Sequence, residues 1–320
     1  MTSKLLKLPL LKKQNNILSL LPINYIQAAT SENTRKAYRY DIQHFIFWGG
    51  LLPTTPDILV RYLHEYADKL NSRTLKRRLT AISRWHIYQG FSDPTQNPIV
   101  KKTMIGIKNI HGKPRDKAPA IQLEQLELMI NHLNLDNSLI AIRNNALLQL
   151  GFFGAFRRSE LVSIRYEDLS FVPEGIEILI PRSKTDQAGE GQICAIPYGF
   201  GKLCPVNAIK SWCEKANISS GYVFRAIIKN KVLEEKPLNP QSVSLIIKEL
   251  AKDTHLPNAE KYSGHSLRRG FATVASKKKA SFVSIMRQGR WKHEGTVLSY
   301  IEETQRFEDN AATTILTVPT

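Results

Sequence analysis

Hydrophobic positions recur at helical spacing through the first third of the chain. Ile42, Phe45 and Trp48 follow Ser31, a residue type that often caps a helix N-terminus, and Gly49-Gly50 would end that segment. Similar patterns predict three further helices, one beginning at Thr55-Pro56-Asp57, one capped by Ser72 and one beginning at Asn97-Pro98. These helices would form a small domain.

After a segment rich in Gly, Pro and charge, the pattern predicts a second, longer domain. Two short runs, 175–180 and 192–196, have the length and composition of strands, and residues 181–191 between them would form a hairpin tip. Helical spacing is found in residues 123–133, 139–153, 205–215, 240–253, 267–277, 282–287 and about 296–303. The sequence therefore predicts a mainly α fold with a small antiparallel β-sheet.

We expect four parts. Residues 1–30 form a flexible arm, 31–112 a helical domain, 113–119 a linker and 120–320 the second domain with a C-terminal tail. Lysines interrupt the apolar residues of the arm, so it is not a signal peptide. The three cysteines form no C-x-x-C pair, and no apolar run would cross a membrane, which indicates a cytoplasmic protein with reduced thiols.

The charge of the chain indicates a polyanionic partner. Its 45 Lys and Arg against 28 Asp and Glu give a net charge of +17. Residues 1–116 hold 19 basic and 7 acidic residues, so they carry +12 of that total. The polar faces of the helix beginning at Ser72 carry basic residues and no acid. The simpler explanation for this charge is a face that only contacts water. We expect contacts with DNA phosphates from its basic residues, namely Arg73, Lys76, Arg77, Arg78 and Arg84.

Several residues in the second domain could carry chemistry. Arg157 and Glu160 are three residues apart, so on a helical turn the carboxylate could orient the guanidinium. His265 and Arg268 have the same spacing at a predicted helix start, where free N–H groups favour an oxyanion. Each residue also has an ordinary explanation, such as a surface ion pair or a basic helix start. Three more candidates are Lys184 at the hairpin tip, Trp291, and Tyr300 near the C-terminus.

The order of these residues is more specific than any one of them. Arg157 in R-x-S-E-L, Lys184 on a turn, His265-x-x-Arg268, Trp291 and Tyr300 nine residues later resemble the tyrosine recombinase (phage integrase) family. Residues 31–38 are similar to the opening of its core-binding domain. The resemblance covers the chain from about Ser31 to the end and implies a helical core-binding domain followed by a catalytic domain.

The resemblance also implies roles for the residues. Tyr300 would attack a DNA phosphodiester and form a 3′-phosphotyrosyl link, without metal, ATP or another cofactor. Arg157 and Arg268 would stabilise the charge on the phosphate, His265 would help to manage the tyrosine proton, and Lys184 would protonate the leaving 5′ oxygen. Trp291, at a position where the family more often has His, would donate one hydrogen bond. Glu160 would not touch the phosphate and would support the residues that do.

We therefore expect a site-specific recombinase that binds double-stranded DNA and associates with the bacterial nucleoid. The family implies a tetramer on two duplexes, and the residues after Tyr300 could dock on a neighbouring protomer through Phe307, Ala311, Ala312, Ile315 and Leu316. Two alternatives remain, a type IB topoisomerase and a catalytically silent DNA-binding factor. Tyr262 is a rival nucleophile, and Arg158 and Arg269 are rival arginines.

Overall fold

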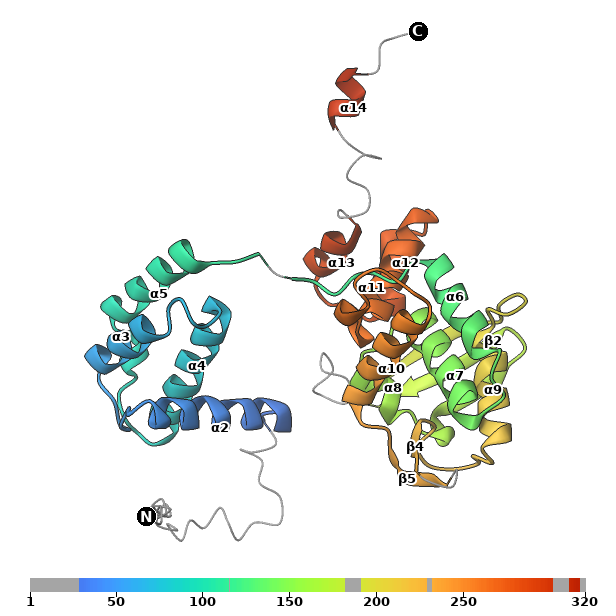
Figure 1. Ribbon diagram of the computed structural model, residues 1–320, viewed down its shortest axis with the longest axis horizontal. Coiled ribbons are helices and arrows are strands. Elements are labelled where there is room, and N and C mark those ends of the chain that lie inside the picture. Colours follow the sequence, from blue (N-terminus) through green and yellow to red (C-terminus); the bar gives the residue numbers. More distant parts are fainter. Residues whose placement is uncertain (1–28, 115, 182–190, 229–231, 302–310, 317–320) are drawn as a thin grey trace. The chain divides into compact units, whose positions relative to one another are not determined.

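The chain divides into two compact units, Met1–Arg115 and Asp116–Thr320. The computed structural model describes residues 29–114, 116–181, 191–228, 232–301 and 311–316. The division falls inside the segment in which the sequence changes composition, and each unit has its own hydrophobic core. The two units are shown in Figure 1 and are described separately.

The described residues of the first unit form four α-helices and one short 3₁₀ turn, drawn in blue to green in Figure 1. Its core includes Phe45, Tyr62 and Leu75, each with no exposed surface. The elements are α2 (Glu32–Phe47), α3 (Pro56–Glu65), α4 (Ser72–Tyr88), η2 (Pro94–Gln96) and α5 (Pro98–His111). All four predicted helices are confirmed.

The predicted helix caps are confirmed in part. The Ser31 side chain accepts a hydrogen bond from the backbone N–H of Thr34 at 3.3 Å, as expected for an N-cap. The cap of α4 is Asn71 and not Ser72, because the amide oxygen of Asn71 accepts from the N–H of Arg73. Thr55 occupies the N-cap of α3 without a side-chain hydrogen bond, so there Pro56 sets the start of the helix.

The second unit is also mostly helical, with α7 at its centre. Buried residues lie all around this helix, which is why its sequence is apolar on every side. The helices are α6 (Leu123–Leu133), α7 (Leu139–Phe153), α8 (Arg158–Ser163), α9 (Pro205–Lys215), α10 (Pro240–Asp253), α11 (Gly264–Lys277), α12 (Phe282–Gly289), α13 (Glu294–Ile301) and α14 (Ala311–Leu316).

Two small antiparallel sheets are found in the described part of the second unit, where the sequence predicted one. The strands β1 (Leu169–Val172), β2 (Gly175–Ile180) and β3 (Gln192–Pro197) form the first, in the order β1-β2-β3. The strands β4 (Arg225–Ile227) and β5 (Leu233–Pro237) form the second. The prediction missed β1, β4 and β5 because three to five residues are too few to show a strand period.

Two helix starts also differ from the prediction, and both differences affect residues near the candidate site. Helix α11 begins at Gly264 rather than at residue 267, because Ser263 caps it, so His265 lies inside its first turn. Helix α13 begins at Glu294 rather than near residue 296.

A second, smaller apolar cluster forms where α11, α12 and α13 pack together (orange to red in Figure 1). It contains Ala155, Ala272, Ile285, Trp291, Val297 and Tyr300. Helix α11 also lies against the segment after the domain boundary, where the N–H of Ile121 donates to the carbonyl of Ser266 at 3.2 Å. A Cβ atom on Gly270 would come within 2.2 Å of the Ile121 carbonyl oxygen, so this approach requires glycine.

Candidate active site

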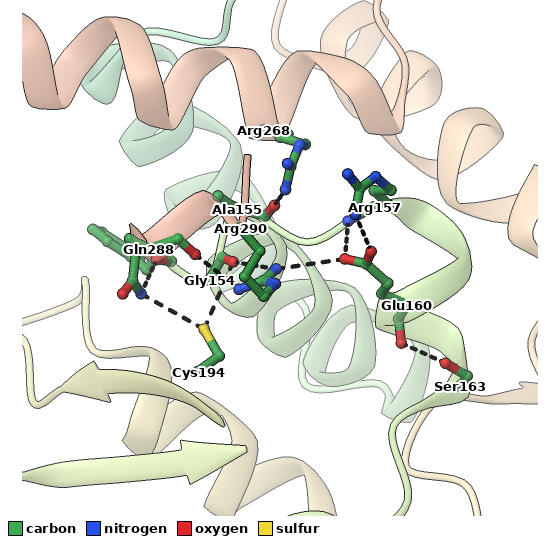
Figure 2. Close-up of polar contacts among 10 residues, drawn as sticks. Gly154, Ala155, Arg157, Glu160, Ser163, Cys194, Arg268, Gln288 and Arg290 are labelled. Atoms are coloured by element: carbon green, nitrogen blue, oxygen red, sulfur yellow. Dashed lines mark hydrogen bonds and ion pairs between the residues drawn. The ribbon is translucent and has the colours of Figure 1, made fainter. Parts of the chain in front are cut away.

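The turn between α7 and α8 positions Arg157. Arg157 is the N-cap of α8, and the Glu160 carboxylate accepts its backbone N–H at 3.0 Å and its Nη1 at 2.5 Å. Burial by itself raises the pKa of Glu160, but the charge and hydrogen bonds of Arg157 and the charge of Arg290 bring that pKa below its ordinary value. Glu160 is therefore ionised, and its carboxylate holds the Arg157 guanidinium in place (Figure 2).

Helix α11 supplies a histidine and an arginine with different environments. His265 is exposed, whereas Arg268 is 2% exposed and donates through Nη1 to the carbonyl of Ala155. The Arg268 guanidinium carbon lies 4.1 Å from the centre of the Trp291 ring, within cation–π range. The spacing of three residues thus leaves one side chain at the surface and one in the protein interior.

The turn after α12 and helix α13 bring in Trp291 and Tyr300. A Cβ on Gly289 would lie 1.7 Å from the Trp291 ring, so glycine leaves the space that the indole occupies. The Trp291 and Tyr300 rings meet edge to face with centroids 6.2 Å apart. The Tyr300 hydroxyl and His265 Nε2 are hydrogen-bonded at 2.9 Å, so a proton can pass between the phenol and the imidazole.

The site carries more positive than negative charge. Burial lowers the pKa of Arg268 to about 9, and the charges of Arg157 and Arg290 act in the same direction, against Glu160 and Tyr300. The buried Nη2 of Arg268 has no hydrogen-bond partner among the residues that the structure describes. An oxyanion in front of Arg157 and Arg268 would supply both the missing partner and the missing charge.

The phage integrase family matches residues 120–306, which is more than half of the chain. A curated relative, the integrase/recombinase xerD homolog of Selenomonas ruminantium, is 40% identical over 93% of this chain and 90% of its own length. The chain belongs to the phage integrase family. It is a DNA strand-transfer enzyme of the tyrosine recombinase class.

More distant relatives agree with this assignment. The recombinase cre of Escherichia phage P1 is 25% identical over 85% of this chain and 84% of its own length. The fold of this integrase-family protein resembles the XerH site-specific recombinase in a post-cleavage complex, with a TM-score of 0.64, 17% identity, and coverage of 89% of this chain and 80% of that one. It also resembles a lambda integrase dimer bound to a core site, with a TM-score of 0.62, 16% identity, and coverage of 89% and 76%.

Five of the six residues expected to act on the phosphate lie in this one site of the integrase-family protein. Arg157, His265, Arg268, Trp291 and Tyr300 come together from α8, α11 and α13 and the turns beside them. The sixth, Lys184, lies outside the described residues.

The rival residues lie elsewhere or play other parts. Tyr262 is 2% exposed and belongs to the large core of the unit, away from the cluster of Trp291 and Tyr300. Arg158 is exposed and reaches the Ser244 hydroxyl at 3.5 Å. Arg269 donates to the carbonyl of Ala118 at 2.6 Å, and its guanidinium lies 5.6 Å from the Tyr300 ring centre.

Arg290 lies at the site but was not predicted from the sequence. It is 8% exposed, lies between Gly289 and Trp291, and hydrogen-bonds to the carbonyl of Gly154 at 3.0 Å. A basic residue directly before Trp291 was the only signal of it in the sequence.

The five basic residues of α4 do not all face solvent. Arg77 forms a two-pronged ion pair with buried Asp41, at 2.8 and 2.9 Å. Arg78 is 8% exposed and donates to the Tyr62 hydroxyl at 3.0 Å, so its guanidinium is held inside the first unit. Arg73, Lys76, Arg77 and Arg84 are exposed, although the Arg77 guanidinium is held by its pair with Asp41.

Two other kinds of feature are absent from the described residues. No three or more His, Cys, Asp or Glu side chains are grouped there so that they could ligate a metal ion. Likewise, no helix in the described part of the chain has the length and apolar character needed to span a membrane.

Proposed function

We propose that this protein is a site-specific recombinase that cuts and rejoins duplex DNA through a 3′-phosphotyrosyl intermediate. The observation that carries the proposal is the placement of Tyr300. Its hydroxyl is hydrogen-bonded to His265 at 2.9 Å, beside the buried Arg268, whose Nη2 has no partner among the described residues. A nucleophile, a proton acceptor and an oxyanion site are the parts needed for phosphoryl transfer by a tyrosine.

The cleavage step follows from these positions. The Tyr300 oxygen forms a bond to phosphorus while the bond from phosphorus to the 5′ oxygen breaks. The phenol proton passes toward His265, and the 5′ oxygen receives a proton from Lys184. Attack by the free 5′ hydroxyl of another strand reverses the step. Because the phosphotyrosyl bond conserves the energy of the phosphodiester, neither ATP nor another cofactor is required.

The negative charge on the phosphate is the main barrier to attack by Tyr300, and the arginines stabilise that charge. Arg157 and Arg268 present planar donors to the non-bridging oxygens, and both are positioned before substrate arrives. Trp291 has one indole N–H to donate and stacks on Arg268. We assign the stabilisation of the transition state to these guanidinium groups rather than to a metal ion.

We further propose that the two units have different roles. Residues 31–112 would bind duplex DNA, and residues 120–320 would bind it and react with it, with 113–119 as the linker. The exposed Arg73, Lys76 and Arg84 support the first part, together with the +12 charge of residues 1–116. Residues 1–28 lie outside the described part, and we keep residues 1–30 as an arm.

The active species would be a tetramer on two DNA sites, with the C-terminal tail docked on a neighbouring protomer. Ile315 and Leu316 in α14 are 83% and 78% exposed, which is unfavourable for apolar side chains unless another surface covers them. An apolar pocket of about 310 Å³ between α11, α12 and the β3–α9 loop could receive them, lined by residues such as Phe271, Ala275 and Ile285. Phe307 lies outside the described residues.

The test is covalent trapping. Wild-type protein is incubated with DNA flanking its own gene, denatured with detergent and assayed for protein-linked DNA, and the cleavage positions are mapped. Tyr300→Phe should bind the same DNA and give no adduct, since it lacks the attacking oxygen. Recombination of two mapped sites, without relaxation of a plasmid that lacks them, separates a recombinase from a type IB topoisomerase. An absence of any wild-type adduct would leave only the DNA-binding factor.

A further inference from the structure

Arg290 occupies a backbone position that does not favour it. It follows α12 with φ of 54°, in the left-handed region that glycine adopts most easily. Its side chain is 4% exposed, and its Nε atom has no hydrogen-bond partner within the described residues. A buried cation on a strained backbone is costly, so its contacts must account for its presence.

Those contacts join the two turns that carry Arg157 and Trp291. Arg290 Nη2 reaches the Glu160 carboxylate at 3.4 Å and the Gly154 carbonyl at 3.0 Å. Its guanidinium carbon lies 4.7 Å from the centre of the Phe156 ring. Figure 2 shows Glu160 between Arg157 and Arg290, so a single carboxylate receives a guanidinium from each side.

The two arginines use Glu160 in different ways. Oε1 accepts the Arg157 side chain, while Oε2 accepts the Arg157 backbone and lies beside Arg290. Arg290 therefore fixes the rotation of the carboxylate, which in turn fixes the direction of Arg157. Because Arg290 directly precedes Trp291, its contacts also fix the backbone that carries Trp291, whose ring stacks on Arg268.

We propose that Arg290 is a positioning residue for the phosphate site, acting through Glu160 on Arg157 and through its own turn on Trp291. This inference rests on the proposed function, since it assigns Arg290 a role in the cleavage step. The competing explanation is that Arg290 only neutralises a buried carboxylate and supports the fold.

The experiment compares Arg290→Gly with Lys279→Gly. Lys279 is also a left-handed basic residue after a helix, with φ of 63°, but it is exposed, so it controls for backbone relief and loss of charge. Single-turnover adduct formation is measured on a nicked duplex carrying the mapped cleavage site, together with the dissociation constant for that duplex. Arg290→Gly should cleave about 10- to 100-fold more slowly with binding within about threefold of wild type. Lys279→Gly should cleave like wild type.

A double-variant cycle identifies the route. If Arg290 acts in part through Glu160, combining Arg290→Gly with Glu160→Gln should slow cleavage by clearly less than the product of the two single effects, because the route through Glu160 is already lost in either variant. Arg290→Lys, which keeps the charge without the planar fork, should recover part of the rate, and it replaces Arg290→Gly in the cycle if that variant does not fold. The proposal would be overturned if Arg290→Gly cleaved at the wild-type rate, or if the two single effects on the cleavage rate multiplied in full in the double variant.

A second readout does not depend on cleavage. Pyrophosphate stands in for the DNA phosphate, and its effect on the melting temperature reports anion binding by Arg157 and Arg268. We expect a clearly smaller shift for Arg290→Gly than for wild type and Lys279→Gly. If wild type forms no adduct but shows this difference, the proposed function fails and the positioning role stands. Equal shifts in all three proteins would reduce Arg290 to a structural residue.

Discussion

At the scale of single residues, different contacts distinguish two buried arginines that are neighbours in the sequence. Arg268 is enclosed against Trp291 and Ala155, whereas Arg269 reaches the Ala118 carbonyl. Desolvation destabilises the charged form of Arg268, which lowers its pKa to about 9. The site therefore holds unfavourable charge that an anion would relieve.

This gives a prediction about stability. Below pH 9 the charged Arg268 costs folding free energy, of the order of a few kcal/mol. This cost begins to fall as the pH rises above the folded pKa of about 9, and it is gone only above the ordinary pKa of an arginine, because between the two the unfolded chain binds the proton and the folded protein does not. Pyrophosphate should raise the melting temperature of wild type at pH 7. Arg268→Met should melt at the same or a higher temperature without anion and should lose the pyrophosphate shift. A full shift in Arg268→Met, measured by differential scanning fluorimetry, would place the anion elsewhere.

A second prediction separates the two proton-transfer steps. Lys184→Ala should slow cleavage because the 5′ alkoxide leaves poorly without a proton. Replacing that bridging oxygen with sulfur removes the need, since a thiolate is a better leaving group. The sulfur substrate should restore adduct formation by Lys184→Ala, but not by Tyr300→Phe, and only in part by Arg157→Ala. If wild type cuts the sulfur substrate and Lys184→Ala does not, Lys184 is not the general acid.

At the scale of elements, α4 shows how a helix face can be misread. Its basic residues suggested one surface for DNA, yet Asp41 from α2 pairs with Arg77, and Arg78 lies under Tyr62 and His44. The compensating acid comes from another helix, which the sequence of α4 could not reveal. The exposed residues Arg73, Lys76 and Arg84 remain for phosphate contacts.

The exposed basic residues of α4 and the buried Arg78 should respond differently to substitution. Lys76→Ala with Arg84→Ala should leave the fold intact and reduce the slope of log affinity against log salt by up to ~0.9 for each phosphate that is no longer neutralised. Arg78→Ala should instead destabilise the first unit by ~3 kcal/mol, because it leaves Asp41 and Tyr62 with fewer partners. Urea unfolding and DNA titrations at several salt concentrations measure both. An unchanged slope would mean that this face of α4 does not touch DNA.

At the scale of the whole molecule, the tail after Tyr300 carries apolar side chains that the described part of the chain leaves exposed. Helix α14 has six residues, too few to be stable alone, and it exposes Ile315 and Leu316. Such a segment gains stability only by docking on another surface, and a second copy of the chain can provide one.

Ile315→Asp with Leu316→Asp should leave binding to one DNA site within about threefold of wild type and abolish paired-site complexes. An equally exposed leucine, Leu135 at 85%, gives the control Leu135→Asp, which should assemble normally. Native gel electrophoresis with one-site and two-site DNA distinguishes these species. If the tail variant still pairs sites and recombines, the tail does not join the protomers.

Local patterns along the chain were enough to predict most of the helices and the order of the reactive side chains. Helix spacing and capping are local, so α6, α7 and α9 were predicted with their observed bounds, and the series from Arg157 to Tyr300 was enough to suggest the family. Which side chains meet depends instead on how distant segments pack. Glu160 and Arg290 are 130 residues apart in the chain, and burial of a cation depends on segments packed from such distances. No local pattern encodes that, which is why Arg290 was missed and Arg78 was placed on the surface.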